Sequence, residues 1–131
     1  MSLIRYGTGE SGAGKQSLPF ARAVAADGWL YVSGQVAMKD GEIVGGGIVA
    51  EARRAIENMI AILHEAGYDV QDIVRVGVWL DDPRDFWSFN AIYAEYFGAQ
   101  PPARACVQSH MMVNCKVEVD CVAFRADKKS G

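Results

Sequence analysis

The sequence predicts an α+β domain with one mixed β-sheet and two helices packed on one face of that sheet. Three observations carry this prediction. The 131 residues suffice for one domain with its own core. Two long stretches have helical apolar spacing, and five shorter ones have strand-like composition between turn signals. Their order is strand, strand, helix, strand, helix, strand, strand, with a further strand near Ile43 left open, and we expect one domain over residues 1–131.

The first 17 residues are rich in glycine and contain few apolar anchors. Residues 12–17 superficially resemble a phosphate-binding loop. They lack the four-residue spacing between glycines, the Lys-Ser/Thr pair and a preceding apolar strand. We therefore expect a flexible or poorly anchored N-terminal arm over residues 1–17.

Two strands are expected next, at residues 19–26 and 29–33. Asp27-Gly28 lies between them, and an Asp-Gly dipeptide between apolar runs favours a two-residue hairpin because both central residues need positive φ. Asp40-Gly41 predicts a second turn, and the glycines at 45–47 break the chain before a helix.

Both helices have start and stop signals. Apolar residues recur every three or four positions from Ile48 to Ala66, and Gly67 is well placed to end this helix. The second helix starts after Asp82-Pro83, where aspartate suits the N-cap and proline the first turn, and it stops at Gly98.

The strand expected at residues 73–80 is apolar on both faces, with Val74 assigned to the face of Val76. Trp29 and Tyr31 alternate with Leu30 and Val32, so the strand expected at residues 29–33 also carries apolar side chains on both faces. Two helices cover only one face of a sheet, and a large bare apolar face is rare on a soluble monomer. We expect other copies of the chain to bury the second face in a closed ring; the alternative is that long loops cover it.

Two strand-like stretches end the chain, at residues 104–108 and 116–124. Side chains alternate along a strand, so Glu118 and Asp120 share one face of the last strand, where repulsion and burial would raise one pKa. If the two strands are neighbours in the sheet, Arg104 and a carboxylate come together where the strands meet. This would form a pocket for a small anion that needs proton transfer, although an ordinary ion pair is the alternative.

Composition excludes several function classes. The net charge of −3 argues against a general nucleic-acid binder, and the only adjacent basic pairs are Arg53-Arg54 and Lys128-Lys129. The three cysteines, Cys106, Cys115 and Cys121, include no Cys-x-x-Cys, which argues against a disulfide framework and a metal site. No apolar run approaches the roughly 20 residues of a membrane span, and no secretory signal is visible. We expect a cytoplasmic protein without a cofactor.

Six short stretches become specific when their order and spacing are taken together. They are Pro19–Val24, Val32–Gln35, Ala55–Gly67, Phe89–Phe97, Pro101–Val107 and Val117–Asp120. In this arrangement the sequence resembles the RidA/YjgF family, also called endoribonuclease L-PSP. The resemblance implies a chorismate-mutase-like fold, a homotrimer with sites between subunits, and hydrolysis of reactive imines and enamines to 2-keto acids and ammonia.

The resemblance also implies roles for single residues. Arg104 matches the arginine that binds the substrate carboxylate, and Glu118 the glutamate that handles water. Cys106 matches a cysteine whose backbone lines the pocket, Ser33 the serine of the Ser-Gly-Gln motif, and Asn90 a supporting asparagine. The residue types suit the chemistry, because a guanidinium fork fits a carboxylate and a carboxyl group can shuttle protons.

The sequence departs from the family at three places. Phe20 stands where the family commonly has a tyrosine whose hydroxyl reaches the neighbouring pocket, and Arg22 adds a cation. The loop at residues 109–115 differs from the common turn, and His110 either points into the site or is a loop histidine. Two alternatives to the deaminase remain: an endoribonuclease, or a non-catalytic binder of small carboxylates.

Overall fold

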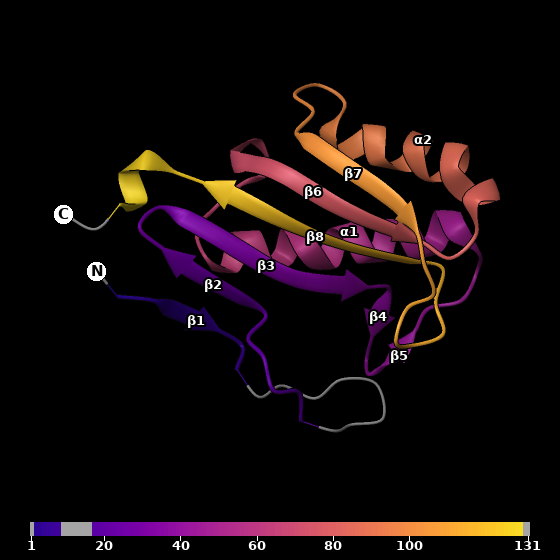
Figure 1. Cartoon of the computed structure of the whole chain (residues 1–131), viewed down its shortest axis with the longest axis horizontal. Helices are drawn as coiled ribbons and strands as arrows, with labels where there is room; N and C mark the ends of the chain where they lie inside the picture. Colours follow the sequence, from indigo (N-terminus) through magenta and orange to yellow (C-terminus); the bar gives the residue numbers. More distant parts are fainter. Residues whose placement is uncertain (1, 9–16, 130–131) are drawn as a thin grey trace.

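The computed structural model describes residues 2–8 and 17–129 of the chain. A six-stranded sheet carries two α-helices on one face (Figure 1). Its strands are β1 (Ile4–Tyr6), β2 (Ala23–Ala26), β3 (Trp29–Val36), β6 (Ile73–Leu80), β7 (Ala103–Gln108) and β8 (Val117–Phe124). The remaining elements are the helices α1 (Ile48–Glu65) and α2 (Phe86–Phe97), the short strands β4 (Met38–Lys39) and β5 (Glu42–Ile43), and the 3-10 turns η2 (Val70–Asp72), η3 (Pro83–Asp85) and η4 (Ala126–Lys128). The predicted α+β class is confirmed.

The strands follow the order β1-β2-β3-β8-β6-β7 across the sheet. Neighbouring strands are antiparallel except β6 and β7, which are parallel. Parallel neighbours need a crossover connection, and α2 provides it. As a result β6 lies between β7 and β8 (Figure 1).

Both predicted Asp-Gly turns are confirmed. Asp27 and Gly28 have φ of 50° and 91°, and Asp40 and Gly41 have φ of 53° and 82°. The first turn joins β2 to β3, and the second joins β4 to β5 near the strand left open at Ile43.

The strands next to the first turn differ in length from the prediction. β2 starts at Ala23 rather than at Pro19, whose ring nitrogen has no proton to donate to a ladder. β3 continues to Val36 instead of ending at residue 33. Because β2 pairs only with residues 29–32 of β3, the second half of β3 has no β2 partner on that side.

The prediction of a flexible or poorly anchored arm is wrong for residues 4–6. These residues form β1, which pairs antiparallel with β2. The three residues Ile-Arg-Tyr are too short a run to give a clear strand pattern. The strand is largely exposed, so it does not need a buried apolar face. Residues 9–16 of the predicted arm lie outside the described residues.

The core lies between the helices and one face of the sheet. Its largest fully buried side chains are Leu30, Ile56, Met59, Leu63, Val76, Val78, Leu80, Phe89, Val117 and Val119. Glu51 of α1 is buried among them, and its Oε1 accepts a hydrogen bond from the backbone N–H of Lys116 at 2.9 Å. This bond ties α1 to the start of β8.

A bulge in β6 changes the predicted faces of that strand. The register with β8 shifts between Ile73 and Arg75, which moves Ile73 to the helix side, opposite Ala123. Val74 is therefore exposed, and the prediction that it shares the buried face of Val76 is wrong. A bulge adds one residue to a strand and reverses the alternation beyond it.

The sheet face away from the helices carries apolar side chains that the described loops leave open. Trp29 and Tyr31 are 39% and 52% exposed there. The homotrimer that would cover this face remains a prediction. Over residues 2–8 and 17–129 no helix could span a membrane, and no cluster of three metal-ligating side chains is found.

Candidate functional site

The predicted site residues fall into two groups at different parts of the sheet. Phe20, Ser33 and Glu118 line a cavity beside the half of β3 that has no β2 partner. Arg104 and Cys106 lie instead on the edge strand β7, where Arg104 faces α2, the helix that carries Asn90. One chain therefore holds the predicted site residues in two separate groups.

The expectation that Arg104 and Glu118 converge between adjacent strands is wrong for a single chain. Arg104 pairs with Val76 of β6, a buried residue on the helix side of the sheet. Glu118 pairs with Trp79 of the same strand, whose side chain points to the opposite face because side chains alternate. The crossover through α2 places β7 beside β6, so β8 is one strand away and the two side chains lie on opposite faces.

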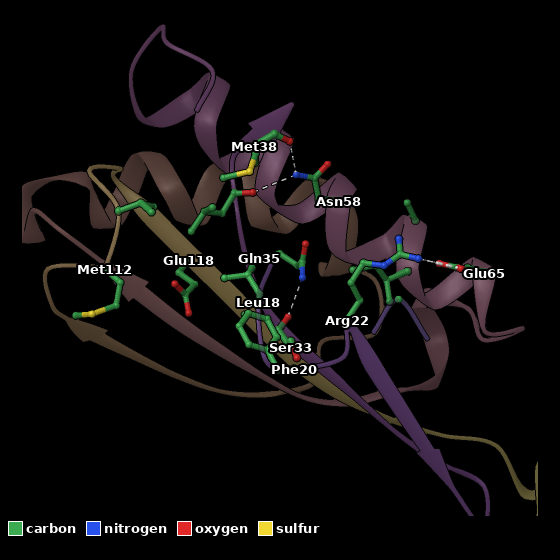
Figure 2. A pocket seen from close by; sticks show the side chains of 16 residues that line it. Leu18, Phe20, Arg22, Ser33, Gln35, Met38, Asn58, Glu65, Met112 and Glu118 are labelled. Carbon is green, nitrogen blue, oxygen red and sulfur yellow. Dashed lines mark hydrogen bonds and ion pairs between the residues drawn. The ribbon is translucent and has the colours of Figure 1, made fainter. Parts of the chain in front are cut away.

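The cavity beside β3 has a volume of about 940 Å³. Figure 2 shows Glu118 on one side of it and the Arg22–Glu65 pair on the other, with Phe20 and Gln35 between them. Its walls come from the segment before β2, the second half of β3, α1, and the loop between β7 and β8. The segments meet here because β2 stops short and leaves the edge of β3 open.

Glu118 lies directly over Gly34 of β3. A side chain at position 34 would collide with the Glu118 carboxylate, so glycine makes room for the acid. Burial raises the pKa of Glu118, and the neighbouring Asp120 carboxylate raises it further. Glu118 thus holds a proton to higher pH than an ordinary glutamate does, which suits proton transfer.

A second glycine, Gly77, makes room for the Asp120 carboxylate. The carboxylate lies over Gly77 of β6, whose N–H donates to Asp120 Oδ1 at 3.1 Å. Burial raises the pKa of Asp120, while the hydrogen bond from Gly77 lowers it. Glu118 and Asp120 share a face of β8, as predicted, and Asp120 is one of the causes that raise the pKa of Glu118.

Ser33 and Gln35 shape the open edge of β3. The Ser33 hydroxyl donates to the Ala21 carbonyl at 2.6 Å, and Gln35 Nε2 donates to the Ser33 carbonyl at 3.2 Å. The serine therefore holds the segment before β2 against β3. A register shift between Val32 and Gln35, where the strand bulges, turns this stretch toward the cavity.

Arg22, whose role the sequence left open, lies on the far wall of the cavity. Its Nη2 is 2.9 Å from Glu65 Oε1 on α1. The pair joins the segment before β2 to the helix and brings a cation and an anion to the same end of the cavity.

Arg104 lies over three aromatic rings of α2. Its guanidinium carbon is 4.7 Å from the ring centroid of Tyr93, 5.8 Å from Phe89 and 5.9 Å from Phe86. No acid of the described residues lies within ion-pairing distance of this guanidinium. A stacked guanidinium keeps its in-plane N–H groups available, so Arg104 can receive an anion in two parallel hydrogen bonds.

The surroundings of Arg104 hold further unmet polar atoms. Across the ranges that the structure describes, Asn90 Oδ1 and Tyr93 Oη are buried without a hydrogen-bond partner. Cys106 is half-buried, and burial raises the pKa of its thiol, which keeps it protonated and makes it a poor nucleophile.

His110 lies beside Glu118 but outside the large cavity. Both residues line a smaller hollow of about 170 Å³. His110 Nδ1 is 2.7 Å from Asp81 Oδ1, and the histidine side chain is 92% exposed. It is a loop histidine held by an aspartate, as one of the two alternatives had it.

Several lining residues were not singled out from the sequence. Asn58 of α1 donates to the carbonyls of Val36 and Met38 at 3.1 and 2.8 Å and so fixes the end of β3. A polar residue next to the apolar stripe of a helix was its only signal. Met112 and Val113 reach the cavity from a loop, which no periodicity predicts.

Comparison with known proteins agrees with this architecture. The chain is 39% identical over 110 residues to a RutC family protein of Pyrococcus horikoshii, covering 82% of this chain and 87% of that protein. It is 37% identical over 127 residues to a human 2-iminobutanoate/2-iminopropanoate deaminase, covering 95% and 93%. The crystal structure of E. coli TdcF with bound serine superposes with a TM-score of 0.80 at 30% identity and covers 93% of this chain and 98% of that one. Residues 13–125 match the endoribonuclease L-PSP family, and the chain belongs to that family.

Proposed function

We propose that the protein hydrolyses reactive 2-imino acids and their enamine tautomers to 2-keto acids and ammonia. One observation carries the proposal: Arg104 stands over aromatic rings without an acidic partner among the described residues, while Glu118, whose pKa is raised, lines the cavity at the edge of β3. The relatives named 2-iminobutanoate/2-iminopropanoate deaminase support the reaction, and the serine in TdcF supports recognition of a small carboxylate.

The residues on β7 and the residues that line the cavity would form one site when two copies of the chain meet. The β7 edge with α2 of one copy would lie against the β3 edge of the next, in a closed ring. We propose that the same ring covers the apolar face that carries Trp29 and Tyr31, which are 39% and 52% exposed in one chain. Each site then contains Arg104 from one copy and Glu118 from its neighbour.

In the proposed reaction Arg104 holds the substrate carboxylate. The Glu118 carboxylate takes a proton from water as the water oxygen adds to the imine carbon, and it passes this proton to the nitrogen to give an amino alcohol. Glu118 then carries the hydroxyl proton to the amino group, the carbon–nitrogen bond breaks, ammonia leaves, and the keto group forms. Acid–base help of this kind accelerates reactions about 10²–10⁴-fold, and Cys106 contributes no nucleophile.

The test uses two variants, Arg104→Met and Glu118→Gln, with an imine generated in the assay by an amino-acid oxidase and catalase. Each variant alone should lose the acceleration of ammonia release over the rate measured without the protein. Unfolded and refolded together in equal amounts, they should regain about a quarter of the wild-type rate, because about a quarter of the sites in randomly mixed rings hold both native residues. Activity that stays absent in the mixture would contradict a shared site, and unchanged turnover in both variants would contradict the site itself.

A non-catalytic binder of small carboxylates is the second candidate. Phe20 favours it, because this residue lines the cavity without the hydroxyl that the sequence comparison led us to expect. If the protein binds 2-oxobutanoate through Arg104 but does not accelerate ammonia release from any imine, this second function is established instead.

A further inference from the structure

Glu51 is the one charged residue that is buried among the residues that the structure describes. Only 5% of it is exposed, and it lies on the buried side of α1 beside Ala52. It stands in the first turn of the helix, where the partial positive charge of the helix N-terminus stabilises a carboxylate. A buried acid is costly unless polar groups satisfy it, so the partner of Glu51 shows what the residue is for.

That partner is Lys116, the last residue of the loop between β7 and β8. Glu51 Oε1 accepts a hydrogen bond from the Lys116 N–H at 2.9 Å, although the two residues are 65 positions apart. The Lys116 carbonyl in turn accepts the N–H of Asp81, which directly follows β6, at 3.0 Å. Lys116 is therefore held by α1 on one side and by the end of β6 on the other.

Further hydrogen bonds fasten the rest of this loop to the same end of β6. The Ser109 N–H donates to the Leu80 carbonyl at 3.0 Å, and His110 Nδ1 lies 2.7 Å from Asp81 Oδ1. Within the described part of the chain, Glu51 provides the only hydrogen bond between this loop and α1. It is thus the connection that sets the loop and the start of β8 relative to the helix layer.

Glu118 follows Lys116 by two residues on the same strand start. Fixing Lys116 therefore also fixes the stretch of β8 in which Glu118 stands over Gly34. Burial raises the pKa of the Cys115 thiol, and the carboxylates of Glu51 and Glu118 raise it further. Both acids are therefore within electrostatic reach of one side chain at the start of β8.

We infer that Glu51 is a positioning residue for the reaction at Glu118: its hydrogen bond to Lys116 fixes the start of β8 and with it the place of the Glu118 carboxylate. The inference rests on the proposed deaminase function and concerns the same site. Glu51 does not line the cavity, so it acts through Lys116 and not on the substrate. A catalytic group that moves by about 1 Å can lose roughly 100-fold in rate, so loss of this bond should lower kcat. Binding of the substrate carboxylate should change little, because Arg104 lies on β7 and stacks on α2.

The test compares Glu51→Leu, which removes the hydrogen-bond acceptor, with Glu51→Gln, which keeps an oxygen at the same place in the side chain. With the imine made from 2-aminobutyrate by an amino-acid oxidase, Glu51→Leu should lower kcat at least about tenfold, while the calorimetric affinity for 2-oxobutanoate stays near that of wild type. Glu51→Gln should keep most of the wild-type kcat. Glu57→Leu is the matched control, because it makes the same substitution on the exposed side of α1 and loses contacts with Arg54 and Tyr96 only. It should change neither quantity.

A pH profile separates positioning from a general loss of stability. When the Glu118 carboxylate moves away from Gly34, it loses part of the burial that raises its pKa. The acid limb of the kcat/KM profile should therefore move to lower pH in Glu51→Leu. A variant that is merely less stable keeps this limb in place below its melting range. The other charged or titratable groups around Glu118 are the same in every variant; they are Asp120, His110, Arg22 and Glu65.

Thermal melts set the assay temperature below the melting range of every variant. If Glu51→Leu does not fold, Glu51→Asp replaces it, because its shorter side chain withdraws the acceptor from Lys116 and keeps the charge; its kcat should then fall below that of Glu51→Gln. An unchanged kcat in the folded variant, or an equal loss in Glu51→Gln or Glu57→Leu, would overturn the positioning role and leave the deaminase function intact. Absence of acceleration by wild type with every imine would overturn both.

Discussion

Replacing Arg104 by methionine separates the binding of an anion from the stability of the fold. Methionine is similar in length and keeps an apolar stem over Tyr93 and Phe89, so the main loss within the chain is the cation–π attraction. That attraction contributes about 0.5–2 kcal/mol at a partly buried position. No described acid pairs with Arg104, so none is left unpaired. The melting temperature should fall by only a few degrees.

The effect on a bound carboxylate should be much larger. Hydrogen bonds to charged groups contribute about 1.5–3 kcal/mol each, and a bidentate pair contributes two that are not fully additive. A loss of about 3–4 kcal/mol corresponds to roughly 10²–10³-fold in kcat/KM. The dissociation constant of 2-oxobutanoate should rise by a similar factor.

The assay combines ammonia release with calorimetric titration of 2-oxobutanoate, and a thermal melt checks the fold. Arg84→Met is the control, since Arg84 is an exposed arginine paired with Asp82 on η3. It should change neither rate nor affinity. If Arg104→Met binds the keto acid as tightly as wild type, the assignment of Arg104 as the carboxylate anchor is refuted.

Three further predictions concern Glu118 and its neighbours. Gly34→Ala should displace the Glu118 carboxylate and lower kcat at least about tenfold. The control is Gly45→Ala, where an added methyl group meets no other atom, and it should not change kcat. Normal activity in Gly34→Ala would show that Gly34 does not position the acid. Glu118→Gln should be more stable than wild type at pH 7–8, because a carboxyl group with a raised pKa destabilises the fold as pH rises through its folded-state pKa and the acid ionises. Below the ordinary pKa of 4.5 the acid is protonated in the folded and unfolded states, so the gain in stability should vanish there. Thermal melts at both pH values test this, and a gain that is largest in acid would contradict the reasoning. Asp120→Asn should lower the pKa of Glu118 and move the acid limb of the kcat/KM profile to lower pH, and an unmoved limb would mean that another group controls it.

Most local features of the chain follow from the sequence. The Asp-Gly pairs place both turns because few L-residues adopt positive φ, and the apolar spacing of residues 48–66 fixes α1 and its buried side. Glu118 and Asp120 share a face because side chains alternate on any strand. The family follows as well, since its motifs occur in order along the chain.

The tertiary structure decided which of these residues meet. Residues 104–108 and 116–124 alternate in the same way whether they are neighbours or not, and only the crossover through α2 shows that β6 lies between them. The bulges in β3 and β6 depend on pairing with β8, so alternation alone assigned Val74 to the wrong face. Local patterns determine the faces of isolated elements, whereas strand order and bulges arise from long-range pairing. This is why the sequence named Arg104 and Glu118 but only the fold placed them on opposite faces of the sheet.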